Sequence, residues 1–346
     1  MKNNILVSIV IPVFNVRPYL AEALDSVVHQ SYENIEIIII DDGSADGSEA
    51  ICDDYLRKDD RVHVVHQENK GISNARNAGL SLANGDAVAF LDPDDAYHPD
   101  FIASMTEIMI RENADIVTCQ YTAHVTTGRM EATGRGKPQP MAKKGQYDRI
   151  AALRALADGL LDVSVCNKVF RRELWKTIRF PDGHVYEDVD TTYRVFDVCE
   201  TVYVLNRPLY LRRKRPGSIT DTRTLKNLYD RNLAYSHFDS YVEANTPGVF
   251  TIEQTMKRRQ ASLNILFRVY LRYSSKTLRS MYMTEDDLQK CIKEEVQKIG
   301  LKNCSLRSRA AYRMLCSCPS LLRMIYPIYR HVKLFVRIKP PVDPAV

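Results

Sequence analysis

No window of the 346-residue sequence reaches the apolar length of about 20 residues that a membrane-spanning helix needs. The first apolar segment, Ile5 to Val13, is short, contains Pro12 and is soon followed by Asn15. It also lacks a small-residue cleavage site. We therefore expect a strand at this position and not a signal peptide.

Two common site types are also missing. The eight cysteines lack the paired spacing of a zinc site, because Cys316-x-Cys318 has no second pair to complete it. We interpret them as reduced thiols of a cytosolic protein. A dinucleotide site would need G-x-G-x-x-G after the first strand, where this chain has Pro12-Val13-Phe14-Asn15.

Acidic residues are almost missing from the end of the chain. Residues 301–346 contain nine Lys or Arg and one acid, Asp343. The net charge of this segment is +8, so the rest of the chain carries −3 of the overall +5. The basic character therefore belongs to the C-terminal tail, and the body of the protein is slightly acidic.

What is present in the first 122 residues is an alternation of strand-like and helix-like patterns. This alternation predicts an α/β fold with a mostly parallel central sheet, in which ligands bind outside the carboxyl ends of the strands. The predicted strands are Ile5–Val13, Ile35–Ile40, Val62–His66, Ala87–Leu91 and Ile116–Tyr121, and the predicted helices are Pro18–Gln30, Glu49–Lys58, Ile72–Ala83 and Pro99–Glu112.

The pattern is lost from Thr126 to Gly145, a Gly-, Pro- and Lys-containing segment that we expect to be a mobile loop. From Asn227 onward the sequence is largely helical. Between and beyond these points the predicted elements are a helix at Tyr147–Leu160, strands at Val163–Phe170, Val202–Leu205 and Leu209–Arg213, and helices at Ile252–Tyr273 and Glu285–Ile299.

Polar clusters follow the predicted strands one after another. Asn15 follows the first, Asp41-Asp42-Gly43-Ser44 the second, Glu68-Asn69-Lys70-Gly71 the third and Asp92-Pro93-Asp94-Asp95 the fourth. Carboxyl ends of parallel strands share one edge of a sheet, so these side chains are expected to form one site.

The acidic cluster has two interpretations. Asp92-x-Asp94 could hold a divalent cation that also binds a diphosphate. Alternatively, Pro93 forms a simple turn and Asp95 caps the helix expected near Pro99.

The cluster after the second strand is equally open. Asp42 could bond a base or ribose, or Asp-Gly could be a turn in which Ser44 or Ser48 caps the next helix. Arg76 could be a surface charge, or could reach over a nucleotide.

Four motifs in fixed order, VSIVIPVFN, IIIIDDGSADGS, ENKGISNARNAGL and FLDPDDAYHPD, together resemble the N-terminal domain of family 2 inverting glycosyltransferases. The resemblance resumes at CNKVFRRELW, VYEDVDTTYR and LRRKRPGSIT, a set typical of bacterial enzymes that build capsule, exopolysaccharide, O-antigen or wall polymers. It implies the GT-A (nucleotide-diphospho-sugar transferase) fold. The resemblance does not extend to the last hundred residues, where the sequence pattern predicts a helical C-terminal extension.

The resemblance implies roles for residues of the nucleotide motifs. Pro12, Phe14 and Asn15 would line the nucleotide of a UDP-sugar. Asp42 would contact uracil, with Arg76 nearby. Asp92 would approach the ribose and the metal, and Asp94 would ligate Mg²⁺ or Mn²⁺.

The later motifs would supply the chemistry. Asp188, next to Glu187, would be the general base that takes the proton from the acceptor hydroxyl; an exposed acid at a helix start is the alternative. Arg212, Arg215 and Ser218 resemble a basic loop that closes over the diphosphate. A solvated charge run is the alternative for this loop.

We accordingly expect a glycosyltransferase domain at residues 1–222, with a nucleotide-binding half (1–122) and an acceptor and catalytic half (146–222), followed by a helical region at 223–346. The acceptor would be a hydroxyl of a glycan or lipid-linked sugar. The sequence does not distinguish a hexosyltransferase from an N-acetylhexosaminyltransferase, and it does not determine whether the protein forms a homo-oligomer.

A nucleotidyltransferase is disfavoured because the first strand is not followed by a Gly-rich basic loop. Intact Asp42, Asp92, Asp94 and Asp188 argue against a non-catalytic sugar binder.

The basic tail has three interpretations. Leu, Ile, Phe and Tyr are interspersed with Arg and Lys from Ser320 to Pro341, and Pro327 would divide the segment into two short amphipathic pieces. Such pieces could bind the anionic inner face of the cell membrane peripherally. They could instead pack on the body of the protein. Nucleic acid is not an expected partner, because no binding motif accompanies the charge.

Overall fold

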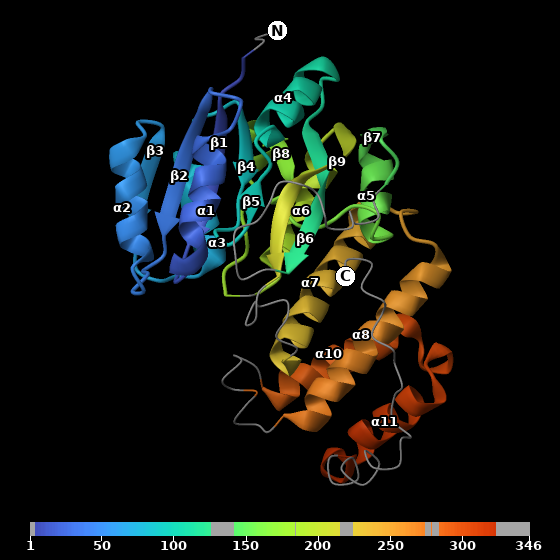
Figure 1. Cartoon of the computed structure of the whole chain (residues 1–346). Helices are drawn as coiled ribbons and strands as arrows, with labels where there is room; N and C mark the ends of the chain where they lie inside the picture. Colours follow the sequence, from blue (N-terminus) through green and yellow to red (C-terminus); the bar gives the residue numbers. More distant parts are fainter. Residues whose placement is uncertain are drawn as a thin grey trace. The chain divides into compact units, whose positions relative to one another are not determined.

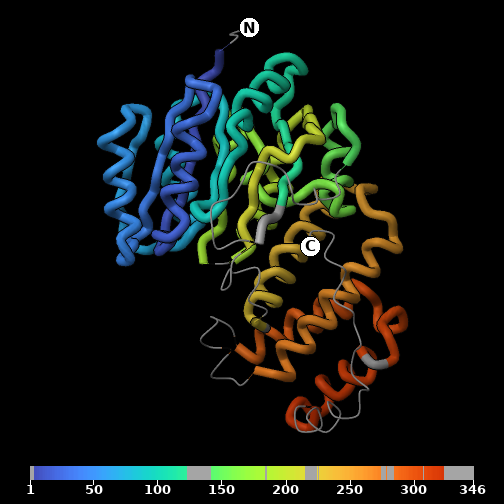
Figure 2. Tube along the Cα trace, in the orientation of Figure 1, coloured from blue at the N-terminus to red at the C-terminus, as the bar shows by residue number. Residues whose placement is uncertain are grey.

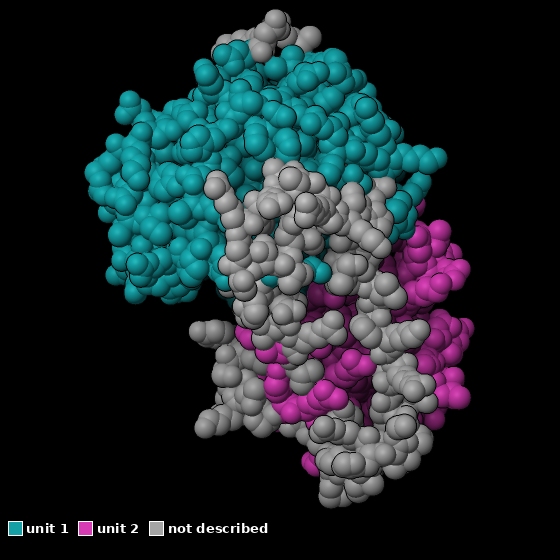
Figure 3. Space-filling model, in the orientation of Figure 1, with its two compact units in different colours: residues 1–221, 344–346 teal, residues 222–343 magenta. Residues whose placement is uncertain are grey.

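The computed structural model describes residues 4–125, 142–183, 185–214, 224–273, 278 and 284–322. These residues fall into two compact units, the first within residues 1–221 and the second within residues 222–343 (Figure 3). Most of the loop expected at Thr126 to Gly145 lies outside the described residues, as do Arg215, Ser218 and the tail beyond residue 322.

The first unit is an α/β domain built around one mixed sheet (Figure 1). Strand order is β3-β2-β1-β4-β8-β6-β9-β5, and β7 pairs with β9. The strands are β1 (Val7–Val13), β2 (Ile35–Asp41), β3 (Val62–His66), β4 (Ala87–Phe90), β5 (Ala96–Tyr97), β6 (Ile116–Val125), β7 (Gly145–Asp148), β8 (Lys168–Arg171) and β9 (Thr201–Lys214). Neighbours among β1 to β4 are parallel, and β8 runs antiparallel between β4 and β6. The predicted fold class is confirmed.

Helices cover this sheet because their apolar residues recur at helical spacing. They are α1 (Arg17–Val28), α2 (Ser48–Lys58), α3 (Ile72–Leu82), α4 (Phe101–Arg111), α5 (Arg149–Ala157) and α6 (Glu187–Val198), with a 3₁₀ turn, η1 (Arg172–Trp175). In α1, for example, Leu20, Ala23, Leu24 and Val27 are the buried residues. Figure 2 traces the chain from the blue β1 to the yellow β9.

Helix α3 packs unusually close to the sheet. Gly79 faces β1, and a methyl group at this position would overlap Val10 Cγ1. The Val10 side chain is fully buried. Arg76 precedes Gly79 by three residues, on the same buried face of α3. The absence of a side chain at Gly79 therefore allows the face of α3 that carries Arg76 to lie close to β1.

Several elements differ from those predicted. The two strands expected at Val202–Leu205 and Leu209–Arg213 form one strand, β9, because a register irregularity opposite Gln120 accommodates Pro208. The strand expected at Val163–Phe170 is reduced to β8, and the helix expected from Tyr147 begins at Arg149 after β7.

The second unit consists of helices, as predicted. They are α7 (Leu225–Asn245), α8 (Ile252–Arg272), α10 (Glu285–Ile299) and α11 (Leu306–Ser317), with a 3₁₀ turn, η2 (Leu301–Asn303). Thr251 and Thr284 each form a capping box at a helix start. The core contains Phe267, Tyr270 and Leu288, and α11 contributes Ala311 and Leu315. Within the described part of the chain, no helix is long and apolar enough to cross a membrane.

Candidate active site

The loops after β1 and β2 are joined directly to each other. The Asn15 backbone has a φ of 49°, and its N–H donates to Ser44 Oγ at 3.1 Å. The Asn15 side-chain oxygen accepts from the Ala45 N–H at 2.9 Å. Beside them, Phe14 is 46% exposed and Pro12 is buried. The sequence therefore places an exposed aromatic ring at the carboxyl edge of the sheet.

Asp42 connects this edge to the loop after β3. Its Oδ1 accepts from the Lys70 N–H at 2.9 Å and from Gln67 Nε2 at 2.6 Å, and its Oδ2 accepts from the Gly71 N–H at 2.8 Å. The carboxylate is 2% exposed. Two carboxylate oxygens offer about four acceptor positions, so these three bonds leave capacity for one further donor.

The serines after Asp42 do not cap α2. Gly47 occupies the N-cap position and offers no side chain, and the N–H of Ser48, the first residue of the helix, donates to Asp46 Oδ1 at 3.0 Å. Ser44 Oγ is used by Asn15, and Ser48 Oγ accepts from the Val16 N–H at 3.1 Å. The capping alternative is therefore wrong, because both hydroxyls join this loop to the one after β1.

The three carboxylates of the acidic cluster after β4 differ in how exposed they are. Asp92 and Asp94 are partly exposed, whereas Asp95 is 5% exposed. Asp95 Oδ1 accepts from the Arg213 N–H at 2.7 Å, and Oδ2 accepts from the Tyr210 hydroxyl at 2.5 Å. Burial and the charges of Asp94 and Asp92 raise the Asp95 pKa well above its ordinary value. The capping role expected for Asp95 is wrong: Asp100 stands at the N-cap of α4, and its side chain accepts from the Ser31 hydroxyl instead of capping the helix.

Arg76 joins the acidic cluster to a motif 111 residues later. Its Nη2 donates to Asp92 Oδ1 at 2.8 Å, and its Nη1 donates to Glu187 Oε1. The guanidinium also lies 5.3 Å from the centre of the Phe180 ring. Burial by itself lowers the Arg76 pKa, but the negative charges of Glu187 and Asp92 outweigh burial, so the Arg76 pKa is raised. Arg76 is 3% exposed, so it is an internal bridge between the two motifs.

Asp188 lies beside this bridge, in the first turn of α6. The helix begins after Tyr186, whose φ is 70°. The Val189 N–H donates to Asp188 Oδ1 at 2.8 Å. Burial raises the Asp188 pKa to about 7, and the Glu187 charge adds to this effect, while Arg76 opposes it. A carboxylate with such a pKa can accept a proton near neutral pH.

Asp92 and Asp94, the two partly exposed acids, can supply some but not all of the ligands of a divalent cation. Carboxylate oxygens are the donors that Mg²⁺ and Mn²⁺ prefer, and Asp92 and Asp94 present two carboxylates on one turn. Among the described residues, no group of three or more His, Cys, Asp or Glu could enclose a metal ion. A cation here would take its remaining ligands from water and diphosphate oxygens.

Arg212 lies near the end of β9, over the ring of Tyr121 at 5.6 Å. Burial works against its charge, but Asp162 and other nearby groups raise its pKa. The guanidinium is therefore a permanent positive charge near the acidic cluster. Its predicted partners Arg215 and Ser218 lie outside the described residues.

The sequence did not reveal the roles of three residues that support this site. Asp95 and Arg213 connect the acidic turn to β9. Lys168 is fully buried, and its Nζ donates to the carbonyls of Asp162 and Ser164 and to Asn167 Oδ1. The alternation of side chains along a strand could have indicated Arg213, because it places Arg213 on the opposite face of β9 from Arg212.

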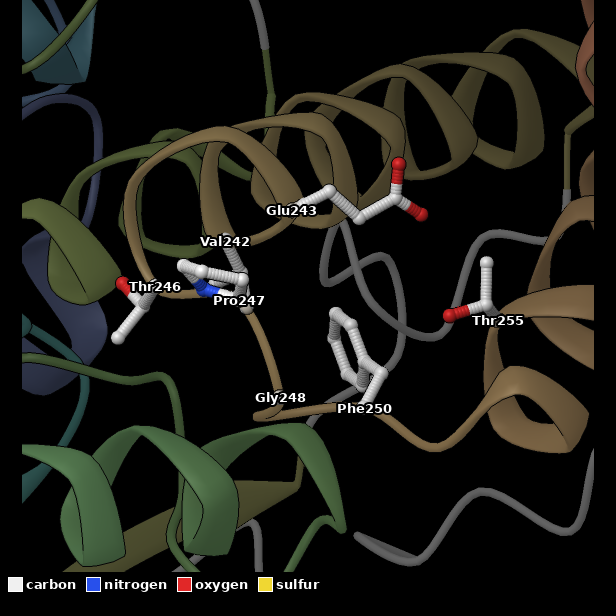
Figure 4. A pocket seen from close by; sticks show the side chains of 7 residues that line it. All are labelled: Val242, Glu243, Thr246, Pro247, Gly248, Phe250 and Thr255. Carbon is white, nitrogen blue, oxygen red and sulfur yellow. The ribbon is translucent and has the colours of Figure 1, made fainter.

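A pocket of the second unit has a different lining (Figure 4). Its walls come from the end of α7, the following turn and the start of α8, and include Glu243, Pro247 and Phe250. None of the predicted site residues lines it.

Comparisons with known proteins agree with this geometry. The family model described as "Glycosyl transferase family 2" matches residues 8–179. "Glycosyltransferase GlyG" of Streptococcus pneumoniae serotype 4 is 32% identical over 222 residues, which are 63% of this chain and 73% of GlyG. The "Minor teichoic acid biosynthesis protein GgaB" of Bacillus subtilis is 43% identical over 91 residues, 25% of this chain and 10% of GgaB.

A solved structure supports the fold. The crystal structure of S. aureus TarS 1-349 in complex with UDP-GlcNAc superposes with a TM-score of 0.65, covering 94% of this chain and 92% of that one at 19% identity. The matched family model and the similarity to GlyG, on a GT-A fold, lead to one conclusion: the chain belongs to glycosyl transferase family 2.

Proposed function

We propose that this glycosyltransferase moves a sugar from a UDP-sugar to a hydroxyl of a glycan or lipid-linked acceptor in the synthesis of a bacterial surface polysaccharide. The observation that carries the proposal is the Arg76 bridge. It fixes Asp92, from the predicted nucleotide half, against Glu187, the neighbour of the predicted base.

The donor would bind along the carboxyl edge of the sheet. Phe14 offers an exposed ring beside Asn15, and Asp42 keeps capacity for one more donor, which uracil N3–H would supply. Asp92 would approach the ribose. TarS was crystallised with UDP-GlcNAc, which makes UDP-N-acetylglucosamine the first donor to test against UDP-glucose and UDP-galactose.

Asp188 would act as the general base. It would take the proton of the acceptor hydroxyl as that oxygen attacks the anomeric carbon, and the bond to UDP would break in the same step. One displacement inverts the configuration. A pKa of about 7 suits this task, because about half of the carboxylate is ionised at neutral pH and the ionised form is basic enough to take the proton.

The diphosphate would be neutralised from two sides. A Mg²⁺ or Mn²⁺ ion held by Asp94 and Asp92 would stabilise the charge that develops on the leaving UDP. Arg212 would contact the diphosphate from β9, with Arg215 and Ser218 following it in the chain.

The acceptor is expected to be a cell-wall polymer or a lipid-linked precursor. The name of GgaB refers to minor teichoic acid biosynthesis, which makes wall polymers and lipid-linked precursors suitable test acceptors. We propose that the enzyme works at the inner face of the cell membrane, with residues 1–222 as the catalytic domain and the basic tail as a peripheral contact.

One experiment tests the reaction class. Purified protein with Mn²⁺ would be given each UDP-sugar, with and without acceptor, and released UDP and pyrophosphate would be quantified. Two results together support the proposal: UDP is released only when acceptor is present, and NMR shows that the transferred sugar has the inverted anomeric configuration. Pyrophosphate formation would indicate a nucleotidyltransferase, and binding without turnover would indicate a sugar-binding protein.

A further inference from the structure

Arg213 is an almost completely buried charge next to the acidic turn. Its side chain is 1% exposed, and it contacts three separate parts of the first unit. Nε donates to the Asp94 carbonyl at 3.0 Å, Nη2 donates to Glu22 Oε2 of α1 at 2.5 Å, and the guanidinium lies 4.9 Å from the centre of the Tyr19 ring. One side chain thus holds the turn, helix α1 and strand β9 together.

Asp95 adds a second connection between the same turn and the same strand. Its two oxygens accept from the Arg213 backbone N–H and from the Tyr210 hydroxyl. The turn is itself closed by the Asp95 N–H, which donates to the Asp92 carbonyl at 3.0 Å. The peptide backbone that carries Asp92 and Asp94 is therefore fixed to β9 by three hydrogen bonds.

The opposite side of β9 explains why this attachment matters. Successive residues of a strand face opposite sides, so Arg213 points into the buried contact while Arg212 lies over Tyr121. The attachment through Arg213 consequently fixes the position of Arg212 relative to Asp94.

We propose that Arg213 is a positioning residue that sets the spacing between the metal-binding carboxylates and Arg212, and so determines how the diphosphate is held from both sides. This inference rests on the proposed function of Asp92, Asp94 and Arg212. Arg213 itself touches neither metal nor substrate in this assignment.

The chemistry of the contact requires arginine. The planar guanidinium presents donors in fixed directions, which allows it to bond the Asp94 carbonyl and Glu22 at once while its face covers Tyr19. A lysine could keep the ion pair with Glu22, but its single ammonium group cannot reproduce both directions. We therefore expect Arg213→Lys to restore only part of what Arg213→Met removes.

The test measures metal and nucleotide binding directly. Mn²⁺ affinity would be measured by electron paramagnetic resonance with and without UDP, and UDP affinity by calorimetry with Mn²⁺ and with chelator. Arg213→Met is expected to weaken Mn²⁺-dependent UDP binding by about 10- to 100-fold, the usual effect of losing a group that orients a metal ligand. UDP binding in chelator should weaken by a smaller factor, because the metal no longer contributes and only the contact of Arg212 with the diphosphate is then disturbed.

A matched control is available on the same strand. Arg207 donates to Ser104 Oγ at 2.8 Å, well before the acidic contact in sequence. Arg207→Met should leave Mn²⁺ and UDP affinities unchanged. In turnover, Arg213→Met should raise the Mn²⁺ concentration for half-maximal rate, and saturating Mn²⁺ should restore much of kcat, which a general loss of folding would not allow.

A milder variant covers the case in which Arg213→Met does not fold. Tyr210→Phe removes only the hydroxyl that donates to Asp95, and it should weaken Mn²⁺-dependent UDP binding in the same direction by a smaller factor. If folded Arg213→Met, or Tyr210→Phe in its place, binds Mn²⁺ and UDP as the natural protein does, the positioning role is refuted. If the natural protein itself binds no Mn²⁺ with UDP, the proposed metal site fails first, and the positioning role with it.

Discussion

The most informative perturbation is Glu187→Gln, because it changes the charge next to the proposed base without touching the base. Glu187 raises the Asp188 pKa by repulsion, second only to burial. The glutamine keeps an oxygen that can accept from Arg76 but removes the negative charge. The Asp188 pKa should then fall, while burial still holds it above that of an exposed aspartate.

The size of the effect follows from the pKa of about 7. A base with this pKa is roughly 90% ionised at pH 8 and roughly 10% ionised at pH 6, so kcat/KM of the natural enzyme should fall about tenfold between them. Glu187→Gln should move this decline to lower pH, so that the ratio of the two rates approaches one. Because Asp188 must lose its proton to act, activity rises with pH in both proteins.

The assay is UDP release at low donor concentration from pH 5 to 9, with Glu173→Gln as the control for loss of an exposed acid in the same half of the domain. The control should reproduce the natural profile. A natural profile that is flat between pH 6 and 8, or an unchanged profile in Glu187→Gln, would contradict the assignment of Asp188.

Four further outcomes are expected. Asp188→Asn should reduce transfer by roughly 10²- to 10⁴-fold and leave UDP affinity nearly unchanged; near-normal turnover would exclude it as the base. Chelator should abolish activity, and Asp94→Ala should weaken Mn²⁺ and UDP binding together while Asp100→Ala does not; full activity in excess chelator would reduce the acidic cluster to a turn. Lys168→Met leaves one buried and two partly buried acceptors without their donor, at about 1 kcal/mol or more each, so thermal melting should show a Tm at least about 5 °C lower, an expectation contradicted by an unchanged Tm. Removal of residues 323–346 should release the protein from anionic vesicles and spare donor hydrolysis, and equal sedimentation with vesicles would refute a membrane role for the tail.

The truncation point in the last experiment comes from the structure. A cut before Leu306 would remove α11, whose Ala311 and Leu315 lie in the core of the second unit. Such a cut would damage folding and membrane binding together. Cutting after residue 322 keeps α11, and it still removes the basic segment.

The sequence predicted the first half of the fold well because local patterns determine it. Isoleucine-rich β2 and the helical spacing of α1 need no partner to be recognised, and β3 was predicted with the bounds that the structure has. The edge where Asn15, Asp42 and Asp92 gather follows from the direction of parallel strands alone.

The second half depended on contacts between distant segments. Pro208 looks like a strand break, yet an irregular register with β6 carries β9 through it. Helix α6 begins after Tyr186 without a capping side chain, so no local capping pattern marked its first residue. The bridge from Arg76 to Glu187 joins residues too far apart in sequence for any periodic pattern to reveal.

The close approach of α3 to β1 gives the site a dependence on a residue that carries no chemistry. A single methyl group at Gly79 would collide with Val10 and push α3 outward. Arg76, one turn earlier on the same face, would be drawn away from Glu187 and Asp92. In a mutational scan, Gly79→Ala would therefore resemble an active-site defect. The depth at which one helix sits on the sheet thus decides whether Arg76 can connect Asp92 to Glu187.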